Sequence, residues 1–256
     1  MEKEVVLDAT PEQVWEAIAT GPGITAWFVP TEVEPREGGR MRQDFGSGFE
    51  VAGHVTAWEP GQRFGYGGLE PAEDSERPNY AFEFLVEGRA GGSTVLRFVQ
   101  SGFLDTGDWA GEYDSFDTGW DLFFANLTAY LRYFAGRPAH GVTAMGYTAL
   151  DPQQAWPIFH TALGLSGQPE LGDEVTLTPE GMPPITGVVD VATPQFLGVR
   201  TADALYRFGA EGSTGCGISA YHYFYREDVD VDAARTAWQG WLSRLFPAPE
   251  HAEAPR

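Results

Sequence analysis

The side chains best suited to doing chemistry in this sequence are aromatic, and they recur along one predicted helix. Large apolar side chains return every three or four positions, at Phe116, Trp120, Phe123, Phe124, Leu127, Leu131 and Phe134. That spacing predicts a long amphipathic helix with an aromatic face. Such a face either packs a core or walls a pocket for a small apolar or aromatic molecule. The pattern alone leaves both interpretations open.

Aromatic residues on the strands before this helix supply a second wall. Tyr80, Phe82 and Phe84 alternate along one strand, and we expect their face to look toward the helix. Trp27 and Phe28, which precede Pro30, are expected at the mouth of the interior. We therefore predict a ligand-binding set of Trp27, Phe28, Phe64, Tyr66, Phe82, Phe84, Phe98, Trp120, Phe123, Phe124 and Leu127.

Few polar side chains are candidates for this interior. Gln43 shares a strand face with Met41 and Phe45, and Tyr66 and Gln100 are further candidates, whereas alternation turns His54 toward solvent. Because these residues form no known catalytic motif, we predict no catalytic residues. An enzyme would need at least two of Tyr66, Gln100 and His54 to converge on one point.

Metal and cofactor sites are not expected. The five histidines are dispersed, and the single cysteine, Cys216, cannot build a thiolate cage, so it is interpreted as a small buried residue. The glycine pattern at residues 215–220 enters a predicted strand instead of a helix, which removes its dinucleotide-binding mechanism. Acidic runs at residues 70–76 and 105–114 are interpreted as solvated loops, the second at the cavity entrance. We predict no metal and no cofactor.

Composition excludes several classes of function. The 256 residues contain 37 acidic and 16 basic side chains, for a net charge of −21, and Lys3 is the only lysine. A P-loop and a lysine Schiff base are therefore excluded, and so negative a surface disfavours nucleic acid. No apolar run approaches the ~18 residues of a membrane span, and the first residues do not resemble a signal peptide. We expect a cytoplasmic protein with no membrane insertion.

The elements that must position these side chains form an ordered series. Thr10, Pro11 and Gln13 predict the start of a short helix with a capping box, after a strand at residues 5–7. A second short helix or turn carries Ile24. Strands without intervening helices then predict an antiparallel sheet, and their ranges are 40–45, 49–58, 63–66, 80–87 and 94–100.

The order of elements repeats after Pro138. Residues 142–149 predict a strand, and residues 151–156 parallel residues 10–15. Gly187, Val189 and Pro194 match Gly53, Val55 and Pro60 at equal spacing. Residues 231–246 take the place of the closing helix. We interpret the chain as a tandem duplication with domains at 1–138 and 139–256, the second shorter and more divergent.

The first half resembles a known superfamily. The residues that carry the resemblance include the motif at 9–15, Trp27, Gly38 and Gly39, and the motifs at 53–55, 59–64, 101–103 and 119–131. They are similar to the SRPBCC (START-like) superfamily, in its branch of heat-shock-chaperone ATPase activator homologues. The resemblance implies an α+β helix-grip fold, a curved antiparallel sheet wrapped around a long C-terminal helix, often with a cavity for apolar molecules between them. It implies no universal catalytic motif.

These observations favour non-catalytic binding of a small hydrophobic or aromatic molecule, lipid-like or polyketide-like, between the sheet and the long helix. One alternative is an enzyme resembling polyketide cyclases and aromatases. Another is a chaperone-interacting or partner-interacting protein, or a homo-oligomer. Fold and function are separable in this superfamily, so the choice depends on the site.

Overall fold

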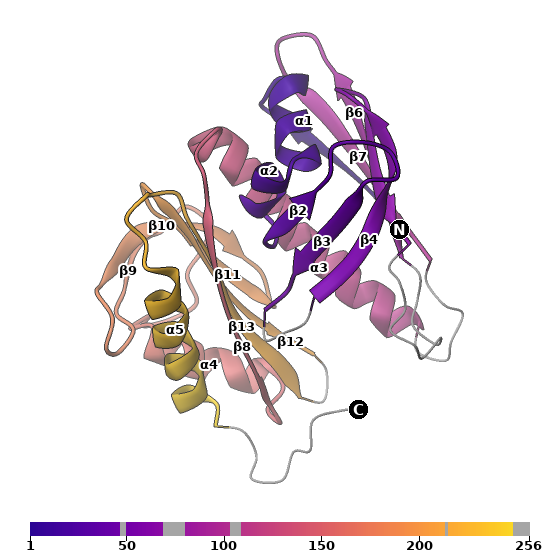
Figure 1. The fold of residues 1–256 in the computed structure, drawn as a ribbon. Helices are drawn as coiled ribbons and strands as arrows, with labels where there is room; N and C mark the ends of the chain where they lie inside the picture. Colours follow the sequence, from indigo (N-terminus) through magenta and orange to yellow (C-terminus); the bar gives the residue numbers. More distant parts are fainter. Residues whose placement is uncertain (47–49, 69–79, 103–108, 213–214, 248–256) are drawn as a thin grey trace. The chain divides into compact units, whose positions relative to one another are not determined.

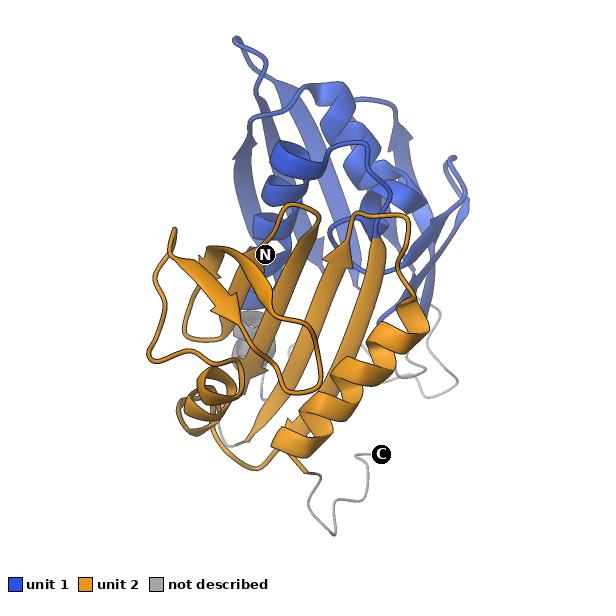
Figure 2. Cartoon of the chain, turned by 90° about the vertical axis from the view of Figure 1, so that its left-hand side faces the viewer, with its two compact units in different colours: residues 1–139 blue, residues 140–256 orange. Residues whose placement is uncertain are grey.

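The computed structural model describes residues 1–46, 50–68, 80–102, 109–212 and 215–247, with the backbone alone for residues 109–116. It divides into two compact units, Met1–Ala139 and His140–Arg256 (Figure 2). Each unit is an antiparallel sheet with a long helix across one face (Figure 1). The expected α+β architecture of tandem helix-grip domains is therefore confirmed.

Unit 1 contains, in its described residues, a seven-stranded sheet in the order β1-β7-β6-β5-β4-β3-β2. The first strand pairs with the last one, which curls the meander around the closing helix α3. The strands are β1 (Glu2–Leu7), β2 (Thr31–Val33), β3 (Arg40–Asp44), β4 (Glu50–Glu59), β5 (Arg63–Gly67), β6 (Ala81–Gly88) and β7 (Thr94–Ser101). The helices are α1 (Pro11–Ala19), α2 (Gly21–Thr25) and α3 (Trp109–Ala129), which continues into the π-helical turn η1 (Tyr130–Phe134).

Helix α1 begins where its capping residues predict. The Thr10 side chain accepts a hydrogen bond from the Gln13 N–H, and the Gln13 side chain accepts one from the Thr10 N–H. Pro11 occupies the first turn, where its missing N–H costs nothing. The capping box predicted from sequence is confirmed, and it fixes the short helices at one end of the sheet.

The only lysine ties the closing helix to the sheet. Lys3 is on β1, opposite Phe98 of β7. Its Nζ contacts the carboxylates of Asp117, at 2.9 Å, and Asp121, at 2.5 Å, both on α3. Burial by itself would lower the pKa of the ammonium, but the hydrogen bonds that it donates to the two carboxylates, together with their negative charges, raise the pKa overall. Lys3 therefore holds the edge strand against the helix as a charged group.

Unit 2 repeats this plan with, in its described residues, a six-stranded sheet in the order β8-β13-β12-β11-β10-β9. Its strands are β8 (His140–Thr148), β9 (Glu174–Leu177), β10 (Ile185–Ala192), β11 (Phe196–Arg200), β12 (Ala204–Glu211) and β13 (Cys216–Phe224). Its helices are α4 (Pro152–Ala162), with a capping box on Asp151, and α5 (Val231–Leu245). No helix in the described part of the chain has the length and hydropathy to cross a membrane.

An identical irregularity in the two sheets supports the repeat. In unit 1 the N–H of Gly38 donates to the carbonyl of Val55, and the register of β4 against β5 shifts directly after Val55. In unit 2 the N–H of Gly172 donates to the carbonyl of Val189, and β10 shifts against β11 directly after Val189. Both glycines have positive φ, 70° and 92°. A bulge and its glycine turn recur at the same sequence separation, as a duplication requires.

Candidate ligand-binding site

The predicted aromatic residues of unit 1 form one continuous cluster between the sheet and α3. Trp120, at the centre, lies 4.2 Å from Phe98 and 5.2 Å from Phe28, measured between ring centroids. Phe124 lies 5.4 Å from Phe98, and Leu127 is fully buried. The structure therefore brings the predicted set together, and its ring contacts are those of a well-packed aromatic core.

Strand register places these residues in two rows. Tyr66 lies opposite Phe82 on β6, and Phe82 lies opposite Gln100 on β7. Phe64, Phe84 and Phe98 form the neighbouring row in the same way. Because opposite residues in antiparallel strands share a face, one row presents polar groups and the other is purely aromatic.

One side of the cluster is partly open to solvent. Phe45, Tyr80, Phe82 and Phe123 are half-buried, and Phe28 lies 4.4 Å from Phe123 and 5.8 Å from Phe45. We call these four half-buried rings the aromatic rim.

The position predicted for Trp27 is wrong. Its side chain is 1% exposed, and the indole Nε1 donates to the carbonyl of Ala17 at 2.9 Å. That hydrogen bond satisfies the one polar atom of the ring, so the whole side chain is buried and anchors the turn after α2 against α1. Phe28 is 7% exposed and is the one of the two that borders the rim.

Two glutamines are buried behind the rim. Gln43 is 4% exposed and Gln100 is 1% exposed. The Gln100 Oε1 accepts a hydrogen bond of 2.8 Å from the Trp120 Nε1, which fixes the orientation of the amide. The Nε2 groups of Gln43 and Gln100 have no hydrogen-bond partner among the described residues. Two amide donors are thus buried without a partner, one from Gln100 in the polar row and one from Gln43 on β3.

Tyr66 joins this polar group, and His54 does not. Burial raises the pKa of the Tyr66 hydroxyl above its ordinary value, and the nearby Gln43 side chain opposes the shift in part. The hydroxyl is therefore protonated at neutral pH and can donate a hydrogen bond. His54 is exposed on β4, as alternation predicts. The structure places Tyr66 beside Gln43, and it places Gln100 in the same cross-strand row as Tyr66, with Phe82 between them.

Comparison with known families identifies this unit. Residues 8–132 match the family model described as "Activator of Hsp90 ATPase homolog 1-like protein". The matched residues lie within unit 1. No curated protein matches the chain.

Solved structures resemble the activator-like unit alone or the whole chain. Protein MLL2253 from Mesorhizobium loti is 25% identical, covers 52% of this chain and 98% of its own, and superimposes with a TM-score of 0.46. The Aha1 dimer from Colwellia psychrerythraea is 20% identical over 51% of this chain and 94% of its own, with a TM-score of 0.43. The di-domain ARO/CYC protein BexL from the BE-7585A biosynthetic pathway is 16% identical over 100% of this chain and 99% of its own, with a TM-score of 0.47.

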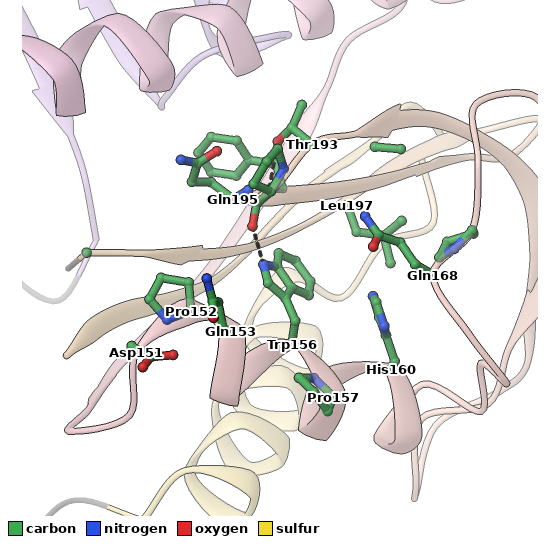
Figure 3. Close-up of a pocket in the computed structure, with 15 residues that line it drawn as sticks. Asp151, Pro152, Gln153, Trp156, Pro157, His160, Gln168, Thr193, Gln195 and Leu197 are labelled. Atoms are coloured by element: carbon green, nitrogen blue, oxygen red, sulfur yellow. Dashed lines mark hydrogen bonds between the residues drawn. The ribbon is translucent and has the colours of Figure 1, made fainter. Parts of the chain in front are cut away.

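Beyond the activator-like unit, unit 2 carries a surface groove that sequence reasoning missed. The groove has a volume of about 680 Å³ and lies between α4, the turn that joins β10 to β11, and residues Gln168 and Pro169 (Figure 3). Trp156 and His160 project into it from α4. His160 is half-buried. The signal for the groove lies in a comparison of the two repeats.

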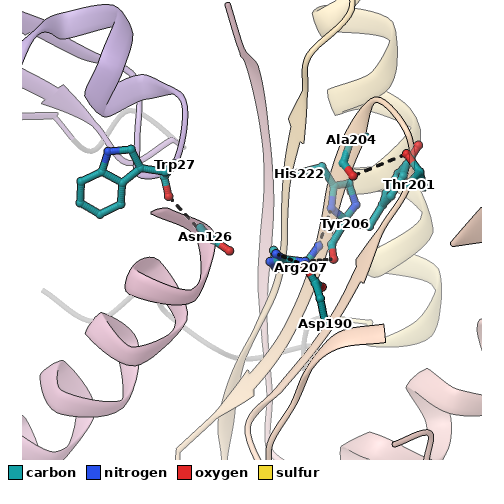
Figure 4. A network of polar contacts seen from close by, with 8 residues as sticks. All are labelled: Trp27, Asn126, Asp190, Thr201, Ala204, Tyr206, Arg207 and His222. Carbon is teal, nitrogen blue, oxygen red and sulfur yellow. Dashed lines mark hydrogen bonds and ion pairs between the residues drawn. The ribbon is translucent and has the colours of Figure 1, made fainter. Parts of the chain in front are cut away.

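The interior of unit 2 holds a different polar residue. His222 is 1% exposed and lies 4.3 Å from Trp238 between ring centroids, and its Nδ1 accepts a hydrogen bond from the backbone N–H of Arg207 (Figure 4). Burial lowers its pKa to about 3, so the ring is neutral at pH 7. With Nδ1 acting as an acceptor, Nε2 carries the proton.

The remaining sequence candidates do not add to a site. Cys216 is buried, and burial, helped by the charge of Asp151, raises the pKa of its thiol, which makes it unreactive. Among the described residues no group of three or more histidine, cysteine or acidic side chains could hold a metal ion. The acidic run at 70–76 and the side chains of the run at 105–114 lie outside what the structure describes.

Proposed function

We propose that unit 1 binds a small, mostly apolar molecule that contains an aromatic ring and at least one carbonyl or hydroxyl oxygen. The observation that carries the proposal is the pair of unpartnered amide donors, on Gln43 and Gln100, buried behind the aromatic rim. The proposal agrees with the cavity that resemblance to the superfamily implies between helix and sheet. The set predicted from sequence without Trp27, together with Gln43 and Gln100, would line the site.

The energetics favour a ligand with this composition. A buried amide N–H without a partner costs about 1–3 kcal/mol, which a ligand oxygen would recover. Apolar surface transferred from water onto the rings adds about 25 cal/mol for each Å² buried. A purely hydrocarbon ligand would gain only the second contribution, and a charged one would enter a site whose buried donors are neutral. The interior therefore favours aromatic ketones, quinones and phenols.

Enzymatic cyclisation is the second candidate, and the polar row is the observation that favours it. A protonated Tyr66 and the amide of Gln43 could stabilise negative charge that develops on a carbonyl oxygen of the ligand. Carbon–carbon bond formation also needs a base to remove a proton. Among the described residues that are buried in unit 1, none is a carboxylate or a histidine. Binding without chemistry is thus the better-supported function.

A matched pair of probes tests the binding proposal. 9-Fluorenone and fluorene share one tricyclic skeleton, and only the ketone offers an oxygen. We expect wild-type protein to bind fluorenone about tenfold more tightly, since one added hydrogen bond is worth about 1.4 kcal/mol. Gln43→Met and Gln100→Met should each reduce that preference, whereas Gln62→Met, at an exposed glutamine, should leave it unchanged.

Isothermal titration and native mass spectrometry measure the two affinities. If neither probe binds, or if the ketone preference persists in both interior variants, the amides are not the recognition groups and the proposal fails. Incubation with a linear polyketone of similar size separates the two candidates. A cyclised product formed by wild-type protein and lost in Tyr66→Phe would establish the enzyme and overturn the purely binding role.

A further inference from the structure

Three aromatic rings of unit 1 pack together where α1 meets the β4–β5 turn, and one of them, Phe64, also belongs to the candidate site. Trp15 lies 5.3 Å from Trp58 and 6.5 Å from Phe64, and Trp58 lies 5.8 Å from Phe64, all between ring centroids. The three rings meet edge to face, which fills the space between the helix and the turn.

Strand register identifies the corresponding residues of unit 2. Trp58 lies opposite Phe64, three residues after the bulge valine, and Ala192 lies opposite Leu197, three residues after the bulge valine of unit 2. The tryptophan of the helix is retained, because Trp156 follows its N-cap by the same five residues as Trp15. Unit 2 thus keeps one ring of the three and replaces the other two with smaller side chains.

The groove of unit 2 occupies the place of the missing rings. Trp156, Ala192 and Leu197 all line it, and its volume of about 680 Å³ is within the range of small-molecule sites. The Trp156 Nε1 donates to the carbonyl of Pro194 at 2.6 Å, which holds the half-buried indole as a fixed wall (Figure 3). The centroid of the His160 ring lies 5.5 Å from that of the Trp156 indole, and the two ring planes are inclined by 34°.

Apart from the carboxylate of Asp151, the polar lining of the groove is uncharged. Asp151 is the only acidic or basic residue among the described lining residues, and its carboxylate accepts the capping hydrogen bond from the Gln154 N–H at 2.9 Å. Burial lowers the pKa of His160, which keeps the ring neutral at pH 7. The lining also contains three amide side chains, which both donate and accept hydrogen bonds. They belong to Gln153, Gln168 and Gln195.

We propose that this groove is a second binding site, specific for a small uncharged molecule whose aromatic ring takes the place that the Trp58 indole occupies in unit 1. The ring would pack beside Trp156, and polar substituents would meet the glutamine amides. The site shares no residue with the aromatic cluster of unit 1, so the result of its test does not depend on the function proposed above.

Indole is the probe that matches the missing side chain. In full-length protein with ¹⁵N-labelled tryptophan, we expect millimolar indole to shift the side-chain N–H signal of Trp156, which Trp156→Leu assigns by its disappearance. Ala192→Trp restores the ring that unit 2 lacks and should weaken indole binding at least tenfold. Trp156→Leu removes the fixed wall and should also weaken it, as measured on the signals of the bound probe.

Two results would overturn the proposal. One is a Trp156 signal that does not move at saturating indole, and the other is wild-type affinity for indole in Ala192→Trp. Indole that shifts only the Trp120 signal would place the probe in unit 1, which would exclude the groove without affecting the fluorenone experiment. Trp58→Ala supplies a positive control, since opening the corresponding space in unit 1 should create a further indole site.

Discussion

Buried polar side chains occupy equivalent positions in the two units and behave differently. Gln100 lies opposite Phe82, and His222 lies opposite Tyr206, so register makes the two positions correspond. Each is next to the tryptophan of its closing helix. Gln100 retains two amide hydrogens, one of which could serve a ligand, whereas the imidazole of His222 is packed among aromatic rings and must remain neutral.

The neutral state of His222 makes unit 2 sensitive to acid. Its pKa of about 3 in the folded protein lies below the ordinary value of 6.5, so the unfolded chain binds this proton first. Above pH 6.5 the histidine is neutral in both the folded and the unfolded state, so it does not change the free energy of unfolding. As the pH falls from 6.5 toward 3, the unfolded state alone binds the proton, and the free energy of unfolding decreases. Between pH 7 and pH 4 we expect wild-type protein to lose about 3 kcal/mol more than His222→Gln.

Denaturant unfolding of the two proteins at both pH values measures this difference. Every other titrating group is common to both chains, so the comparison isolates residue 222. Equal losses in the two proteins would mean that the histidine is protonated in the folded state, contrary to its burial.

The sequence could predict which residues face the interior but not which polar atoms lack partners. Alternation gave the correct face for Gln43 and His54, because a strand reverses its side chains at every residue. That the Gln100 amide is bound by Trp120 through its oxygen and not its nitrogen depends on the packing of α3, which is more than local pattern contains. The burial of Trp27 likewise depends on the carbonyl of Ala17, ten residues earlier.

Helices and strands were predictable where local chemistry is strong. Both capping boxes and both closing helices follow directly from N-cap residues and from helical periodicity. Three short strands, β2, β9 and β11, were missed. Strands this short give few alternations, and β3 and β5, of five residues each, are at the limit of what alternation predicted. The π-helical turn at the end of α3 has no signal in the apolar spacing either.

Glycines within regular elements have opposite roles in the two units. Gly119 lies within α3, and a Cβ added there would meet nothing within 4 Å. Gly198, on β11, leaves room for an ion pair that spans the strand, in which Arg207 binds Asp190 at 2.8 and 3.0 Å (Figure 4). An added Cβ would lie 2.6 Å from the Nη1 of Arg207.

We therefore expect Gly119→Ala to stabilise the protein by about 0.5–1 kcal/mol, because alanine loses less backbone entropy in a helix. Gly198→Ala should destabilise it by about 1–3 kcal/mol through overpacking. Thermal and urea unfolding of both variants measure the changes. Destabilisation by Gly119→Ala would show that the exposed side of α3 is more crowded than its glycine suggests.

The whole molecule combines two copies of one plan that have diverged inside and at the surface. Unit 1 keeps a polar row behind an aromatic rim and closes its outer space with Trp58, whereas unit 2 has Ala192 there and opens a groove. The repeat was predictable from spacing in the sequence. The groove was not, since its origin is visible only once strand register pairs the residues of the two copies.

Net charge is a property of the whole chain and should limit its stability at low salt. With a net charge of −21, the folded state concentrates negative charge that the unfolded state disperses. We expect the free energy of unfolding to rise by about 1 kcal/mol between 0.02 and 0.3 M NaCl, as screening shortens the range of repulsion. KCl should act equally. A fall in stability would indicate that the surface ion pairs outweigh the repulsion.

The lysine that joins β1 to α3 makes the chain unusually simple to probe with amine-reactive reagents. Because Lys3 is the only lysine, acylation of a side-chain amine can occur at one place in the molecule. Its ammonium is held by Asp117 and Asp121, and acylation requires the free neutral amine. The rate of labelling thus reports how often α3 separates from the edge of the sheet.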